Sequence, residues 1–173
     1  MPDPAFRDRL AEIIKIASRQ YPFGSDIDEG CRGIADAILT SEEWQAREAV
    51  VKAAMLRSIE LGFVPMPFCE GKYGDRLEYF LELPKGKVVA HFDMTDMHRA
   101  KDVLKDHVCI MGNVPSPLLQ FGTVKDVEDY CKDLIQYCGK GGGFILTNGS
   151  STDTADPKLV KAMCDSVKKF NVR

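Results

Sequence analysis

The sequence predicts an α/β fold built from parallel strand–helix units. From residue 40 onward, short apolar runs alternate with longer segments in which apolar residues recur at helical spacing. Glycine or proline stands at most of the junctions, for example Gly62, Pro84 and Gly139. Strands that alternate with helices are typical of parallel sheets, because the chain must cross back over the sheet between parallel neighbours.

Four apolar runs are expected to form the strands. They cover residues 63–69, 87–92, 108–111 and 141–146. Two prolines make the first an edge or irregular strand, and Gly112-Asn113 is expected to end the third. The glycines at 141–143 precede a strand rather than follow one, so they favour a tight turn over a phosphate-binding loop.

Capping signals place the two longest helices. Thr40 with Glu43 and Thr123 with Asp126 have the capping-box spacing, so helices are expected to begin there. After Thr123, the apolar residues fall at i, i+4, i+7, i+8 and i+11, which is a strong amphipathic pattern. This stripe consists of Val127, Cys131, Leu134, Ile135 and Cys138.

Three further helices and an N-terminal segment complete the prediction. Thr95 is expected to cap a helix after the second strand, and Asp156 to cap the last helix. A third helix is expected over 75–82, with Leu77, Phe80 and Leu81 on its buried face. The last helix is expected to bury Val160, Met163 and Val167. Residues 1–39 do not show this alternation. They are expected to form a separate helical segment before a domain over 40–173.

Composition excludes several classes of function. The 173 residues carry a net charge of −3 and have a pI near 5.6, so nucleic acid is not an expected partner. No apolar run is long enough to cross a membrane, and no signal peptide is evident at the N-terminus. Six cysteines without a Cys-x-x-Cys pair favour free thiols in the cytoplasm, with Cys109, Cys131 and Cys138 as small buried side chains.

Polar residues follow the predicted strands, where a parallel sheet gathers its ligands. Glu70 and Asp93 are candidate catalytic carboxylates, and Asn113, Asn148 and Ser150 are candidate substrate-binding residues. Glu70, His91 and Cys69 could together bind a metal such as zinc. The alternative is that such residues meet solvent and cap helices, and that His91 is a structural histidine.

Several motifs together resemble a known family. They are Pro67-Phe-Cys-Glu-Gly71, His91-Phe-Asp93, Cys109-Ile-Met-Gly-Asn-Val-Pro115 and Gly141-Gly-Gly-Phe-Ile-Leu146. Over residues 40–173 they resemble the C-terminal half of the uroporphyrinogen decarboxylase-like superfamily, which includes decarboxylases of haem biosynthesis and cobalamin-dependent methyltransferases. The resemblance implies the last four units of a (β/α)₈ barrel. It therefore also implies a homo-oligomer, a partner chain that supplies the other half-barrel, or coverage by residues 1–39.

The resemblance implies two chemistries. In the methyltransferases, a His-x-Cys-Gly motif binds zinc; here Phe68-Cys69-Glu70-Gly71 places Glu70 in the position of the cysteine. In the decarboxylases, the residue matching Asn113 lines the tetrapyrrole pocket, and Asn148-Gly149 replaces their histidine-glycine. The preferred hypothesis is part of a corrinoid-linked methyltransferase system, with the corrinoid presented by a partner protein. The alternatives are tetrapyrrole decarboxylation and a non-catalytic half-barrel that assembles with a partner chain.

Overall fold

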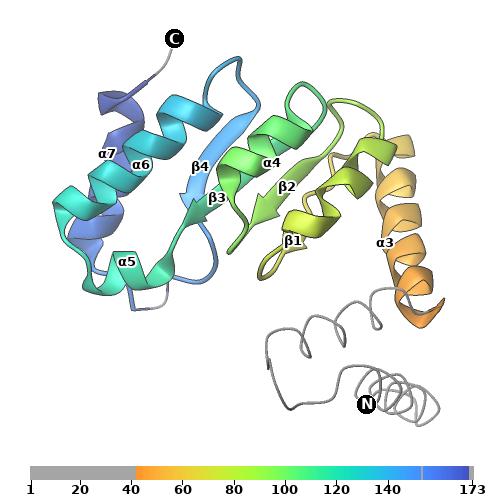
Figure 1. Cartoon of the computed structure of the whole chain (residues 1–173), viewed down its shortest axis with the longest axis horizontal. Coiled ribbons are helices and arrows are strands. Elements are labelled where there is room, and N and C mark those ends of the chain that lie inside the picture. The colour runs from red at the N-terminus through yellow and green to blue at the C-terminus, as the bar shows by residue number, and fades with distance from the viewer. Residues whose placement is uncertain (1–41, 153, 172–173) are drawn as a thin grey trace, which may run out of the picture. The chain divides into compact units, whose positions relative to one another are not determined.

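The structure, a computed structural model, describes residues 42–152 and 154–171 (Figure 1). The chain divides into two compact units, Met1–Met55 and Leu56–Arg173, and the second contains every strand of the described residues. Helix α3 (Glu42–Glu60) ends in a Schellman motif, in which Gly62 donates to the carbonyl of Ile59 and Phe63 to that of Ser58. The predicted cap at Thr40 and the boundary after residue 39 lie outside the described residues and stay predictions.

A four-stranded parallel sheet confirms the predicted α/β class and corresponds to part of a TIM barrel. The strands run in the order β1-β2-β3-β4, so the first and last are its edges. One register row joins Phe68 of β1, His91 of β2, Met111 of β3 and Ile145 of β4, and side chains in one row share a face. The bounds are β1 (Phe68–Cys69), β2 (Val89–Phe92), β3 (Cys109–Val114) and β4 (Phe144–Asn148).

Helices cover one face of this sheet. Figure 1 shows α4 and α6 lying across the strands, and α7 beside α6. The sheet side chains beneath them are buried, as at Ala90, Phe92 and Ile110. The elements are a 3₁₀ helix η1 (Gly74–Glu82) and the helices α4 (Met97–Leu104), α5 (Ser116–Phe121), α6 (Val124–Cys138) and α7 (Pro157–Lys169).

Helix α6 confirms its prediction in detail. Thr123 accepts a hydrogen bond from the Asp126 N–H, and the Asp126 carboxylate accepts one from the Thr123 N–H. The hydroxyl and the N–H of Thr123 both donate to the Asp126 carboxylate, and these two hydrogen bonds hold the pKa of Asp126 below its usual value. All five residues of the predicted stripe are buried. Three residues of the stripe (Val127, Cys131 and Ile135) form one core cluster with Val114, Leu119, Leu159 and Ala162.

Two predicted helical faces were wrong in part. In η1, Leu77 and Phe80 are buried, as is Leu83 directly after it, but Leu81 is 42% exposed. The reason is that a 3₁₀ helix has three residues per turn, so every third residue shares a face. The buried residues of α7 are Leu159, Ala162 and Ser166, one position before each predicted residue, and Val167 is exposed.

Three predicted boundaries also differ from the structure. Asp96, not Thr95, caps α4, because its side chain accepts from the N–H groups of His98 and Arg99. Strand β3 does not end at Gly112 but continues to Val114, and its residues 110–114 pair with β4. Regular pairing in the first predicted strand is limited to Phe68–Cys69. The glycines at 141–143 form the predicted turn, since all three have positive φ.

Candidate functional site

Asp93 is the meeting point of three loops at the carboxyl edge of the sheet. Its N–H donates to the Cys69 carbonyl at 3.3 Å, and its Oδ2 accepts from the Gly71 N–H at 3.2 Å. Gly149 packs against it so closely that a Cβ there would lie 3.1 Å from the Asp93 Oδ1. Oδ1 accepts no hydrogen bond from the part of the chain that the structure describes. One oxygen of this half-buried carboxylate is therefore held by a backbone N–H, and the other has no hydrogen-bond donor among the described residues.

Asn113 fixes the position of Asp93. Its Nδ2 donates to the main-chain carbonyls of Asp93 at 2.8 Å and Thr95 at 2.7 Å. Its Oδ1 accepts from the Tyr130 hydroxyl at 3.0 Å. The side chain is buried and joins β3 both to the loop after β2 and to α6. The geometry gives Asn113 a positioning role, and its predicted contact with substrate stays a prediction.

Gly112 allows β3 to pass close to β2 just before Asn113. Its φ is +142°, and a Cβ at this position would lie 2.6 Å from the Phe92 carbonyl oxygen. The peptide bond between Gly112 and Asn113 is cis. Only glycine fits here, because any side chain would collide with the backbone of the neighbouring strand.

His91 connects the second strand with the end of the fourth. Its Nε2 lies 3.0 Å from the Asn148 carbonyl oxygen, and its ring is tilted against Phe68 at 5.1 Å. A carbonyl oxygen can only accept, so Nε2 carries the proton in this contact. The predicted site residues His91 and Asn148 are thus brought together across β3.

Asn148 and Ser150 belong to a polar network at the end of β4. Asn148 donates through Nδ2 to the Ser150 carbonyl and accepts from the Thr147 hydroxyl at 3.0 Å. The Ser150 hydroxyl lies 3.1 Å from that of Ser116, which also donates to the Ser151 carbonyl at 2.5 Å. The loop after β4 is therefore tied to the start of α5.

The three predicted metal ligands do not converge. Cys69 is buried on the helix-covered face, and burial raises the pKa of its thiol to about 12, against a smaller opposing effect of Arg76. His91 lies with Phe68 on the opposite face, and Glu70 is exposed. Within residues 42–152 and 154–171, no three His, Cys, Asp or Glu side chains form a group that could hold a metal ion. Zinc therefore stays a prediction with no ligand set in this geometry, and no chemical step is derived through it.

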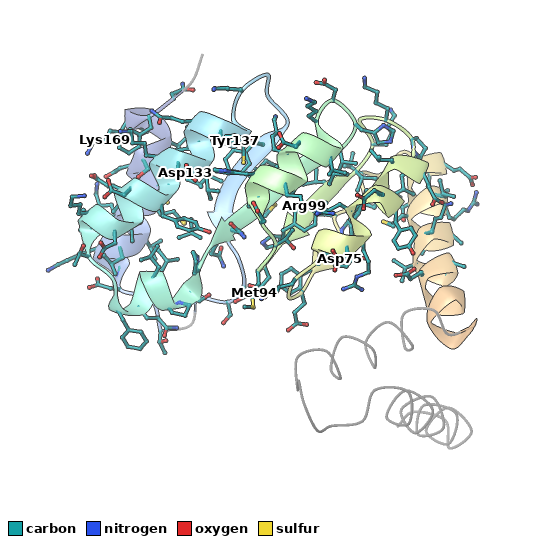
Figure 2. The ribbon with its side chains drawn as sticks, in the orientation of Figure 1. Asp75, Met94, Arg99, Asp133, Tyr137 and Lys169 are labelled. Carbon is teal, nitrogen blue, oxygen red and sulfur yellow. The ribbon has the colours of Figure 1, made fainter. Side chains whose placement is uncertain are left out.

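Several residues that support the site were not predicted. Thr95 is buried and accepts from the Tyr73 N–H at 2.9 Å, and Tyr130 reaches Asn113 from α6. Their partners are backbone groups or residues distant in sequence, so no local pattern indicates them. Helices α4 and α6 are joined nearby by a stack of His98 on Tyr137 at 4.0 Å, with His98 Nε2 also 2.8 Å from Asp133. Figure 2 shows Asp133 and Tyr137 along α6.

Comparison with known proteins agrees with this architecture. A family model for uroporphyrinogen decarboxylase (URO-D) matches residues 47–170, well over half of the chain. The chain belongs to the uroporphyrinogen decarboxylase family. No curated protein matches the chain closely enough to count as a relative. Among the helices of the described residues, none is both long and apolar enough to cross a membrane.

Proposed function

We propose that this chain is part of a corrinoid-linked methyltransferase system, and that the carboxyl edge of its sheet faces a corrinoid presented by a partner protein. The observation that carries the proposal is the chemistry of this edge. It combines carboxylates at Glu70 and Asp93 with amides and hydroxyls at Asn148, Ser150 and Ser116. Neutral amide side chains surround a corrin ring, and such groups pair well with carboxylates, amides and hydroxyls.

The same chemistry disfavours tetrapyrrole decarboxylation as the alternative. Uroporphyrinogen carries carboxylates around its ring, and these would meet Glu70 and Asp93 with like charge. The cations in the segment that directly follows β1 are Lys72, which is exposed, and Arg76, which lies over the Tyr73 ring at 4.1 Å. Recognition of many carboxylates favours several arginines in forked contacts, and no such group stands at this edge among the described residues.

Within this proposal, Asp93 is the catalytic carboxylate. Its Oδ1 would accept a proton from the methyl acceptor, while the Gly71 N–H holds Oδ2. His91 would line the pocket through its ring and keep the end of β4 in place through Asn148. Asn113 would act as a positioning residue, since it holds the main chain of Asp93 rather than the reacting group. The five described cysteines are free thiols, which supports the expected cytoplasmic location.

Equilibrium dialysis of the full chain against methylcobalamin, followed by absorbance, tests the proposal. We expect saturable binding that weakens about tenfold in His91→Ala, the loss expected for one ring contact and one hydrogen bond. Glu78→Gln is a matched control, because Glu78 is exposed on η1 and pairs only loosely with Arg99 at 3.7 Å.

The same experiment with uroporphyrin separates the alternatives. Binding of uroporphyrin without methylcobalamin would support decarboxylation instead. Binding of neither would reject both tetrapyrrole functions and leave the non-catalytic half-barrel as the better description.

A further inference from the structure

Among the residues that the structure describes, no strand pairs with the outer edge of the first strand. On its other side, this strand bonds to β2 through the carbonyls of Pro65, Pro67 and Cys69. They accept from the N–H groups of residues 89, 91 and 93, respectively. Successive residues of a strand turn their backbone groups to opposite sides. The N–H and C=O groups of Val64, Met66 and Phe68 therefore point away from β2.

The prolines of this strand do not protect its edge. Proline usually blocks an edge strand by turning its missing N–H outward. Pro65 and Pro67 instead face β2, so each outward-facing residue is one that can donate a hydrogen bond. The edge is therefore competent to pair with another strand.

The outer edge of β4 is likewise unpaired within residues 42–152 and 154–171. Ile110 donates to the Gly143 carbonyl at 2.9 Å, and Gly149 donates to the Val114 carbonyl at 2.8 Å. The odd-numbered residues of β4 thus face β3, and Phe144 and Leu146 turn their backbone groups outward. Both edges belong to strands of the same direction.

An apolar surface connects the two edges. We call it the exposed face, and it comprises Val64, Met66, Phe68, Val89, His91, Cys109, Met111 and Ile145. At its two ends, Met66 is 59% exposed and Ile145 is 43% exposed. None of these eight side chains is acidic, lysine or arginine, and the charged residues of the same alternation along β2 lie at its ends, at Lys87 before the strand and Asp93 after it. The residues between these ends, on β2 and β3, are half-buried. An apolar surface that reaches solvent in this way marks an interaction site.

We propose that a second copy of this chain occupies this surface, with β4 of each copy paired to the first strand of the other. A two-fold axis makes the two junctions identical and places all strands in parallel. Two four-stranded sheets supply the eight strands that close a parallel barrel, with helices outside and carboxyl ends at one rim. Closure pairs both open edges and buries both exposed faces, which no single added strand would achieve.

The second copy completes the site. Four strands supply only half of a barrel rim, with one Asp93 and one His91. In the closed dimer, the rim carries two copies of each, facing one interior. The proposal rests on the strand edges and the exposed face, and it holds whichever ligand the rim binds.

Sedimentation velocity of the full chain tests the proposal. We expect a dimer, and we expect Met66→Lys and Ile145→Lys each to weaken it about 30-fold or more, as for loss of one interface hot spot. Val124→Lys is the matched control, because Val124 is 46% exposed at the start of α6, which contacts β3 and β4 on the helix-covered face. Circular dichroism checks that each variant folds, and either edge variant alone is sufficient for the test.

Each outcome has a defined meaning. A native chain that stays monomeric at all concentrations overturns the proposal and indicates that another segment or protein covers the face. A dimer that survives both lysine variants overturns it as well, because its interface lies elsewhere. A dimer that fails to bind methylcobalamin rejects the proposed function only.

Mixed cross-linking tests the direction of pairing. Chains with Met66→Cys are mixed with chains with Ile145→Cys and treated with a short bismaleimide, with the native chain as the background for its own thiols. We expect covalent dimers above background in the mixture alone. Equal cross-linking in Met66→Cys by itself would mean that first strands pair with each other, which contradicts the proposal.

Discussion

The amide of Asn113 donates to the main-chain carbonyl of Asp93 at 2.8 Å, so one strand holds the candidate carboxylate of its neighbour. The Asp93 side chain in turn holds the Gly71 N–H in the loop after β1. Three consecutive strand ends are thus fixed by one buried amide. This arrangement makes the geometry of the edge depend on a residue that need not touch a ligand.

Replacing this amide should cost much of the stability of the fold. Asn113→Ala leaves the carbonyls of Asp93 and Thr95 without their donor and opens a small cavity. We expect the free energy of unfolding in urea to fall by about 2–4 kcal/mol. Tyr130→Phe, which removes one hydrogen bond to the same side chain, should cost about 1 kcal/mol. Equal stability of Asn113→Ala and the native chain would contradict this role.

Gly112 should tolerate no side chain. Alanine there must adopt φ +142° and places its Cβ 2.6 Å from the Phe92 carbonyl oxygen. We expect Gly112→Ala to lower the free energy of unfolding by about 3 kcal/mol or more. Gly142→Ala is the matched control, because Gly142 has φ +81° but no atom within 4 Å of the added carbon. It should cost about 1 kcal/mol, from backbone conformation alone. Similar losses in both would show that the close approach at Gly112 is unimportant.

Stability should fall in alkaline solution. Burial raises the pKa of Cys69 and Cys138 to about 12 and that of Cys131 to about 11, from 9.0. The unfolded thiols therefore lose their protons first as pH rises. The stabilisation is complete below pH 9 and is lost progressively toward pH 11–12. Burial of Tyr130 raises its pKa and acts in the same direction.

Urea midpoints measured from pH 7 to pH 11 check this expectation. Cys138→Ala should flatten the alkaline slope, because it removes one buried thiol, even though it lowers stability at pH 7. Unchanged midpoints over this range would indicate that the thiols are open to solvent.

The spacing of apolar residues was sufficient to predict a helix where that spacing repeats over several turns. Helix α6 has fifteen residues, and its cap and its buried stripe agree with the sequence. In the last helix, the buried residues are Leu159, Ala162 and Ser166. They have the same spacing as the predicted Val160, Met163 and Val167 but lie one position earlier. Spacing sets the period of a buried face, but only packing against α6 sets its rotation.

Tertiary contacts decided the features that the sequence missed. Thr95 and Asp96 are both good capping residues. The Thr95 hydroxyl accepts a hydrogen bond from the Tyr73 N–H in another loop, and Asp96 caps the helix instead. Asn113 bonds to main-chain carbonyls 18 and 20 residues away, and carbonyls carry no sequence signal. Alternation along a strand does predict that Cys69 and Phe68 face opposite sides, and register then places His91 with Phe68.

The prolines of the first strand have a consequence for isotope labelling. Pro65 and Pro67 have no amide hydrogen, so deuterium uptake along residues 64–68 comes only from Val64, Met66 and Phe68. These amides face away from β2, and the amides that report the junction with β2 belong to other segments. Mass spectrometry of this short peptide therefore measures the solvent access of one side of one strand. The outer neighbour of this strand is therefore reported separately from β2.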